Sequence, residues 1–237
     1  VPKNQVMDAF QKFSKKPLTP KDFSCDRVVD KMQGVYIPFW LYSGNCEGSI
    51  TAEGINTRTW TSGNYRYTEK KYYSVYRNGT LDFKAVPVDA SSKTDDDAMD
   101  SIEPFDYSEM TAFNPGYLSG YLAERYDEDK DKCLPRAKER IENTTRDELR
   151  NTCNYNSVNV QSYEKHTEIK DVKYAMLPTW LLYTTYQDKP YFFAMNGQTG
   201  KFIGNLPISK GKLVAYSLLG GVGGYIIGAI LQIMGIF

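Results

Sequence analysis

The sequence predicts an α+β fold: two similar antiparallel β-rich units flanking a helical insertion, with short N-terminal helices and one C-terminal transmembrane helix. Runs rich in aromatic and β-branched residues occur before residue 90 and again after residue 156, as is typical of strands. The stretch between them is acidic, of mixed charge and mostly helical in spacing. The sequence closes with 25 residues that carry no charge.

These changes in composition give the predicted domain boundaries. Residues 1–33 form an N-terminal helical segment, in which Val6, Phe10 and Phe13 recur at helical spacing. The α+β domain covers residues 34–209. It divides into a β unit over 34–90, the helical insertion over 91–155 and a second β unit over 156–206. Residues 210–237 form the predicted transmembrane helix.

The first β unit contains three candidate turns. Ser-Gly-Asn occurs at residues 43–45 and again at 62–64, and Asn78-Gly79 follows. Asn-Gly is the strongest hairpin signal of the three, because a type I′ turn needs positive φ at both central positions. The run over 65–76 alternates aromatic with polar residues, which predicts a half-buried strand.

The C-terminal run is the predicted membrane anchor. As a helix, the 25 residues from Leu213 to Phe237 are about 37 Å long, which exceeds a hydrocarbon core of about 30 Å. Lys201, Lys210 and Lys212 precede the run, and no charge follows it. The positive-inside rule therefore places the protein in the bacterial cytoplasmic membrane with its soluble domain facing the cytoplasm.

Small residues gather on one face of this predicted helix and form the candidate helix–helix interface. They are Ser217, Gly220, Gly221, Gly224 and Gly228. Small residues let a second backbone approach closely in a membrane, so they favour a homo-oligomer or a partner membrane protein. Glycine is also common in membrane helices that do not associate, and this alternative stays open.

Residues with catalytic or metal-binding chemistry are scarce, and the sequence predicts no enzyme. The single histidine, His166, lies in a polar strand-like context, and Cys25, Cys46, Cys133 and Cys153 are too widely spaced for a zinc site. Asp95 to Asp97, with Asp100 and Glu103, are candidate cation ligands, but their position favours the start of a helix. The formal net charge of zero predicts no nucleic-acid partner.

Several long segments of the sequence resemble a known family. The segments GVYIPFWLY, SSKTDDDAMDSIEPFDYSEM, FNPGYLSGYLAERYD and KYAMLPTWLLYTTYQDKPYFFAMNGQTGKFIGNLPIS resemble bacterial TFIIB-type zinc-ribbon-containing membrane proteins of Firmicutes. The resemblance implies an N-terminal zinc ribbon, which would lie upstream of this chain, so the chain itself is expected to hold no cofactor. It also implies SPFH-type or phage-shock proteins as partners in envelope stress. Residues 191–204 resemble the terminal hairpin of PepSY-type domains.

Two functions follow as expectations. The first is a membrane-anchored cytoplasmic scaffold or adaptor, which contacts membrane lipid and assembles with itself or with partner proteins. The alternative is a PepSY-like sensor or regulatory ligand-binding domain tethered to the membrane. A deep apolar pocket with converging polar groups would favour the sensor, and an extensive protein contact would favour the scaffold.

Overall fold

A computed structural model describes residues 2–23, 31–118 and 120–220 of the chain. The chain forms two compact units. We call them the ribbon unit, which comprises Ile37–Asp96 and Glu124–Leu177, and the terminal unit, which comprises Val1–Tyr36, Asp97–Ala123 and Pro178–Phe237. The two longest strands, β1 (Gln33–Ser62) and β4 (Ser157–Tyr186), each run through both units.

The ribbon unit is built on a long antiparallel hairpin. Strand β1 pairs with β2 (Tyr65–Asp89) from Phe39↔Asp89 to Ser62↔Tyr65. The turn at Ser62-Gly63-Asn64 joins the two strands, and Gly63 there has a φ of +60°. One irregularity interrupts the pairing between Tyr42 and Gly44, where Lys84 and Ala85 of β2 stand against Ser43 alone, as in a β-bulge.

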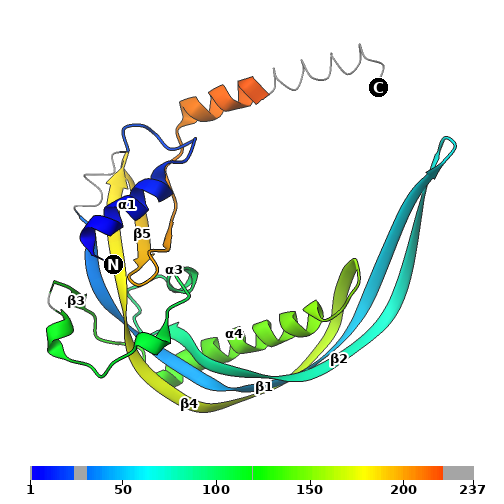
Figure 1. Ribbon diagram of the computed structural model, residues 1–237, viewed down its shortest axis with the longest axis horizontal. Coiled ribbons are helices and arrows are strands. Elements are labelled where there is room, and N and C mark those ends of the chain that lie inside the picture. Colours follow the sequence, from blue (N-terminus) through cyan, green and yellow to red (C-terminus); the bar gives the residue numbers. More distant parts are fainter. Residues whose placement is uncertain (1, 24–30, 119, 221–237) are drawn as a thin grey trace. The chain divides into compact units, whose positions relative to one another are not determined.

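Helix α4 (Lys130–Asn151) covers one face of this hairpin (Figure 1). Its buried residues recur every four positions, so they form a single stripe: Cys133, Ala137, Ile141, Thr145 and Leu149. Leu149 packs with Ile50 of β1 and Val75 of β2. The Asp129 carboxylate caps the helix by accepting from the backbone N–H groups of Asp131 and Lys132.

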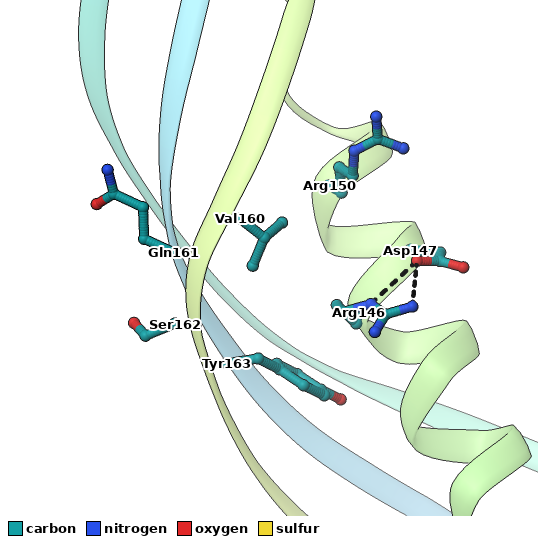
Figure 2. A pocket seen from close by; sticks show the side chains of 7 residues that line it. All are labelled: Arg146, Asp147, Arg150, Val160, Gln161, Ser162 and Tyr163. Carbon is teal, nitrogen blue, oxygen red and sulfur yellow. Dashed lines mark hydrogen bonds and ion pairs between the residues drawn. The ribbon is translucent and has the colours of Figure 1, made fainter.

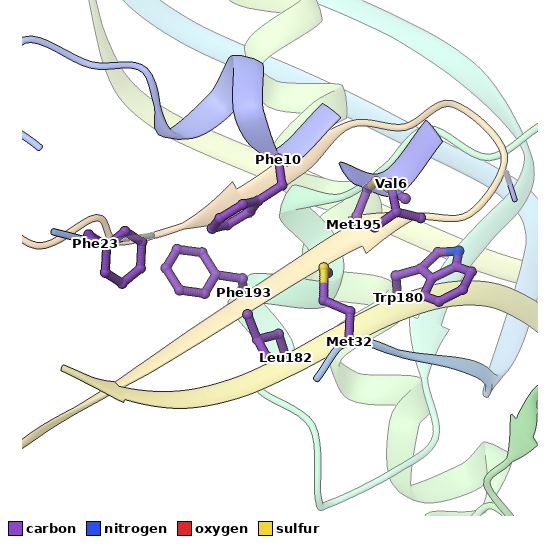
Figure 3. Packing of buried hydrophobic residues seen from close by; sticks show 8 residues of the cluster. All are labelled: Val6, Phe10, Phe23, Met32, Trp180, Leu182, Phe193 and Met195. Carbon is purple, nitrogen blue, oxygen red and sulfur yellow. The ribbon is translucent and has the colours of Figure 1, made fainter. Parts of the chain in front are cut away.

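The terminal unit has an aromatic core between helix α1 (Lys3–Ser14) and the strands (Figure 3). Strand β5 (Lys189–Asn196) pairs antiparallel with β4 on one side and with β6 (Phe202–Gly204) on the other. Val6 and Phe10 of α1 are fully buried against Phe193 and Met195 of β5. The predicted helical spacing of Val6, Phe10 and Phe13 is thereby confirmed.

Short elements complete the described chain. Helix α3 (Asp96–Ser101), the 3₁₀ helices η1 (Tyr107–Glu109) and η2 (Pro115–Leu118) and strand β3 (Leu122–Ala123) follow one another after β2. Strand β3 pairs parallel with β1 at Val35↔Leu122. Residues 210–220 are helical, and Ser209 N–H donates to the carbonyl of Leu18.

The prediction of two similar β units flanking a helical insertion is corrected by the strand order. All six strands of the described chain belong to a single sheet in the order β2-β1-β4-β5-β6, with β3 beside β1. The two β-rich stretches of the sequence therefore contribute neighbouring strands. Sequence periodicity reports which face of a strand is apolar, but it does not report which strand lies beside it.

The predicted transmembrane helix is also corrected. Among the described residues, no helix has the length and the apolar composition needed to cross a membrane. Only residues 210–220 of the expected helix over 210–237 are described, and residues 221–237 lie outside the described part. This finding overturns, for the described chain, the predictions of a single-pass membrane protein and of its place in the cytoplasmic membrane.

Two of the three predicted turns are absent from the hairpin. Asn78 and Gly79 lie inside β2, opposite Ser49 and Gly48, and residues 43–45 lie inside β1 at the irregularity. The third signal, at Ser62-Gly63-Asn64, makes the turn. The second predicted helix, over 21–32, falls mostly on residues 24–30, which lie outside the described residues.

Candidate interaction surfaces

The outer end of the hairpin, which we call the ribbon and define as residues 57–74, is exposed along both strands. In β1, buried residues alternate with less buried ones up to Gly54. Every residue from Thr57 to Ser74 is exposed. The change follows from the length of α4, which ends at Asn151 and has no residues left to cover the outer strands. Figure 1 shows the tip of β1 and β2 extending past α4.

Large aromatic side chains stand on this ribbon. Trp60 and Tyr67 are directly opposite in the ladder and stack with ring centroids 5.7 Å apart. The Arg58 guanidinium lies 5.7 Å from the Trp60 ring. Tyr65 is 71% exposed and belongs to the same face, because alternate residues of a strand share a face. These contacts keep the ribbon paired, but they leave its aromatic face open to solvent.

The ribbon is also basic, although the whole chain has a formal net charge of zero. Residues 57–74 contain four basic side chains and one acidic side chain. The basic residues are Arg58, Arg66, Lys70 and Lys71, and the acidic one is Glu69. Lys71 lies 3.6 Å from Glu69, and both side chains are largely exposed, so this pair offsets little of the positive charge.

Strand β2 forms one edge of the described sheet. Its outer backbone N–H and C=O groups therefore face no strand of the described chain. Natural proteins blunt such an edge with charged side chains, proline, a bulge or a covering loop, and here Lys70 and Lys71 supply charge on β2. In β2 the irregularity and Pro87 come only after residue 83, so the strand pairing is uninterrupted along the part of the edge that carries the aromatic residues.

A second surface is the groove between α4 and β4, which we call the α4–β4 groove (Figure 2). It is a shallow groove, open to solvent, with a volume of about 450 Å³, and it is lined by Arg146, Asp147 and Arg150 from α4 and by residues 160–163 from β4. Val160 and Tyr163 pack on the core, whereas Gln161 and Ser162 between them are exposed. This break in the alternation turns two consecutive polar side chains towards solvent beside the groove.

The terminal unit contains another cavity, of about 420 Å³. Tyr121 and Trp180 line it, with ring centroids 5.4 Å apart, and Met32 contributes a buried side chain. Burial raises the pKa of Tyr121, and its neighbour Tyr36 raises it further. The sensor function stays a prediction, because a cavity of this kind alone does not identify a ligand.

A buried polar cluster fixes α4 to the end of β2. The Asp89 side chain is 1% exposed, and its carboxylate accepts from Arg136 at 2.7 Å and from the Thr94 hydroxyl at 2.9 Å. Arg136 also contacts the Asp96 carboxylate at 2.7 Å. Burial raises the pKa of Asp89 to about 6, against these two hydrogen bonds, which lower it. The cluster is explained by this attachment of α4.

The residues singled out in the sequence are dispersed. Ser217 donates to the carbonyl of Leu213, and a side chain added at Gly220 would meet nothing within 4 Å. Gly221, Gly224 and Gly228, the rest of the candidate helix–helix interface, lie outside the described residues. His166 is exposed on β4. The described part of the chain contains no group of His, Cys, Asp and Glu side chains that could hold a metal ion.

The cysteines and acidic residues of the described ranges form no group that could hold a metal ion. Cys46, Cys133 and Cys153 are buried free thiols, and Cys25 lies outside the described residues. Burial raises the pKa of Cys133 to about 11, which keeps its thiol protonated at neutral pH. Of the acidic run at 95–97, Asp96 takes part in the ion pair with Arg136.

Sequence reasoning missed both surfaces. The run over 65–76 was expected to be half-buried, yet only Val75 in it is buried. One signal was available, since the net charge changes sharply between residues 57–77 and the acidic stretch that follows. The α4–β4 groove left no such signal, because its two arginines are ordinary residues of a solvated helix face.

Comparisons with known proteins give one relative without an assigned function. It is an uncharacterized protein, YdjG, of Bacillus subtilis (strain 168), 38% identical over 218 residues. The match covers 91% of this chain, and the chain spans 64% of the relative. No family model and no solved structure matches the chain. The resemblance to zinc-ribbon proteins and to PepSY-type domains is tested by none of these comparisons.

Proposed function

We propose that the chain is a non-enzymatic adaptor that docks a partner protein on the ribbon of β1 and β2. The observation that carries the proposal is the exposed aromatic face of residues 57–74, with Trp60, Tyr65 and Tyr67 on one side. A two-stranded ribbon with both faces in water is marginally stable by itself. A long, exposed and aromatic ribbon of this kind gains stability when a partner covers it.

The composition of the ribbon favours a protein partner. Trp, Tyr and Arg are the residues most enriched at the energetic centres of protein interfaces, and all three occur here within one face and its border. The Arg58 guanidinium lies over the Trp60 ring, so a cation and an aromatic ring are presented together. Basic side chains around an aromatic centre complement a partner surface that is acidic at its rim.

The experiment identifies the partner through the ribbon itself. A photoreactive phenylalanine analogue replaces Tyr67 in the full chain in cells, and crosslinked products are identified by mass spectrometry. The matched position is Tyr183, which is 62% exposed and opposes another aromatic residue, Phe192, in the β4–β5 ladder. We expect a specific protein adduct at Tyr67 and none at Tyr183. The SPFH-type and phage-shock proteins that the resemblance implies are the first candidates to compare with the adduct.

Binding to the identified partner should depend on the aromatic ring of Trp60. Trp60→Thr keeps a residue with high strand propensity and should weaken binding about 30-fold, as loss of an interface hot spot does. Tyr183→Thr should bind as the parent does. The proposal is wrong if the adduct at Tyr67 is a nucleic acid, or if Trp60→Thr leaves the affinity of the purified pair unchanged.

A further inference from the structure

The α4–β4 groove lies beside an open edge of the sheet. Strand β4 has β1 as its neighbour on one side, and β5 pairs with its other side only from Thr179 to Tyr186. Over residues 157–177, the outer edge of β4 faces no strand of the described chain. Apart from the Val158 carbonyl, which accepts from Arg150, its outward backbone groups there can pair with a strand from another protein, as in domains that bind peptides by strand addition.

Helix α4 supplies positive charge along this edge. Arg146 and Arg150 are one helical turn apart and both line the groove (Figure 2). Arg150 donates its Nε–H to the Val158 carbonyl at 3.3 Å, which ties it to the backbone of β4. No acceptor is assigned to the Nη groups of Arg150 in the described chain, so they remain available to an anionic ligand.

The Arg146 guanidinium already binds one carboxylate, that of Asp147. Its Nε and one Nη donate to the same Asp147 oxygen at 3.2 Å. The two side chains are 41% and 55% exposed, and ion pairs at such exposure contribute little to stability. A carboxylate brought by a docked strand can therefore replace Asp147 at small cost, with Arg150 as a second contact.

We propose that an extended acidic segment of a partner protein adds as a strand to the edge of β4 at residues 159–163 and places a glutamate or aspartate carboxylate against Arg146 and Arg150. The main chain of the segment pairs with β4, which supplies affinity for an extended conformation. The two arginines select acidic residues in the segment. This site is separate from the ribbon, so either proposal can fail without the other.

The probe is a terminally blocked, fluorescein-labelled nonapeptide of alternating valine and glutamate, titrated with the purified full chain in a fluorescence anisotropy assay. Two further peptides separate the two contributions. One carries glutamine in place of glutamate, and the other carries proline at two central positions, which removes main-chain donors. We expect the glutamate peptide to saturate below about 1 mM and the other two to bind at least about tenfold more weakly.

A pair of variants assigns the site. Arg146→Gln should weaken binding of the glutamate peptide about tenfold, as should Arg150→Gln. Lys138→Gln removes a charge from α4 outside the groove and should leave binding unchanged. The proposal is overturned if the glutamate peptide does not saturate below about 1 mM, if the glutamine or proline peptide binds equally well, or if Arg146→Gln binds as the parent does.

Discussion

Gly44→Ala should lower the free energy of unfolding of the ribbon unit by about 3 kcal/mol, the upper end of the usual cost of overpacking. A Cβ atom at residue 44 would stand 2.0 Å from the backbone carbonyl oxygen of Glu168 in β4. A backbone oxygen cannot turn aside as a flexible side chain does. Strand β1 would therefore have to move away from β4 at the point where the β1–β2 pairing is already irregular.

The matched control for this substitution is Gly79→Ala in the neighbouring strand. A Cβ atom at residue 79 would meet Leu149 Cδ2 at 3.5 Å, an ordinary van der Waals contact. Its effect should stay within about 0.5 kcal/mol. Chemical denaturation followed by circular dichroism compares the two variants. Equal stability of Gly44→Ala and Gly79→Ala would show that β1 and β4 do not approach each other at Gly44 as described.

Phe10→Ala should destabilise the terminal unit by about 3–5 kcal/mol, the range measured when a fully buried phenylalanine is truncated. Phe10 is 0% exposed, and its ring lies 5.5 Å from Phe193 and 5.3 Å from Phe202, measured between ring centroids. Truncation leaves a cavity between α1 and the strands. Phe193 and Phe202 lie on β5 and β6, which are paired with each other. These strands cannot move into the cavity without breaking their pairing.

Phe113→Ala provides the comparison for Phe10→Ala. Phe113 is 64% exposed and precedes η2, so its truncation should change the free energy of unfolding by less than about 0.5 kcal/mol. Thermal and chemical denaturation of both variants measure the difference. If Phe10→Ala were as stable as Phe113→Ala, helix α1 would not belong to the core of the terminal unit.

The sequence predicted local structure well where one side of an element is apolar. Val6, Phe10 and Phe13 define α1, and the strand-rich runs fall on β1, β2, β4 and β5. Turn chemistry was a weaker guide. Asn78-Gly79 has the residues of a tight turn, yet it continues β2, because Gly79 stands across from Gly48 under Leu149 and the pairing on both sides holds the chain extended.

The ribbon and the α4–β4 groove could not be predicted from the sequence and became visible only in the structure. An alternation of tyrosine with polar residues is the same whether the aromatic face is covered or bare. What decides between them is the place where α4 ends, at Asn151, relative to the tip of the hairpin. The α4–β4 groove likewise depends on pairing between distant segments, because Arg150 and Val160 meet only when α4 folds back along β4.

The central claim, that a partner protein covers the ribbon, is tested most directly by hydrogen–deuterium exchange of residues 57–74. The chain is compared in its native complex, captured through a tag, and after dissociation and purification. In the purified chain these amides should exchange rapidly, because two strands without a covering layer open easily. In the complex the account predicts exchange at least about tenfold slower, confined to the ribbon. Equal exchange of residues 57–74 in the two samples would contradict it.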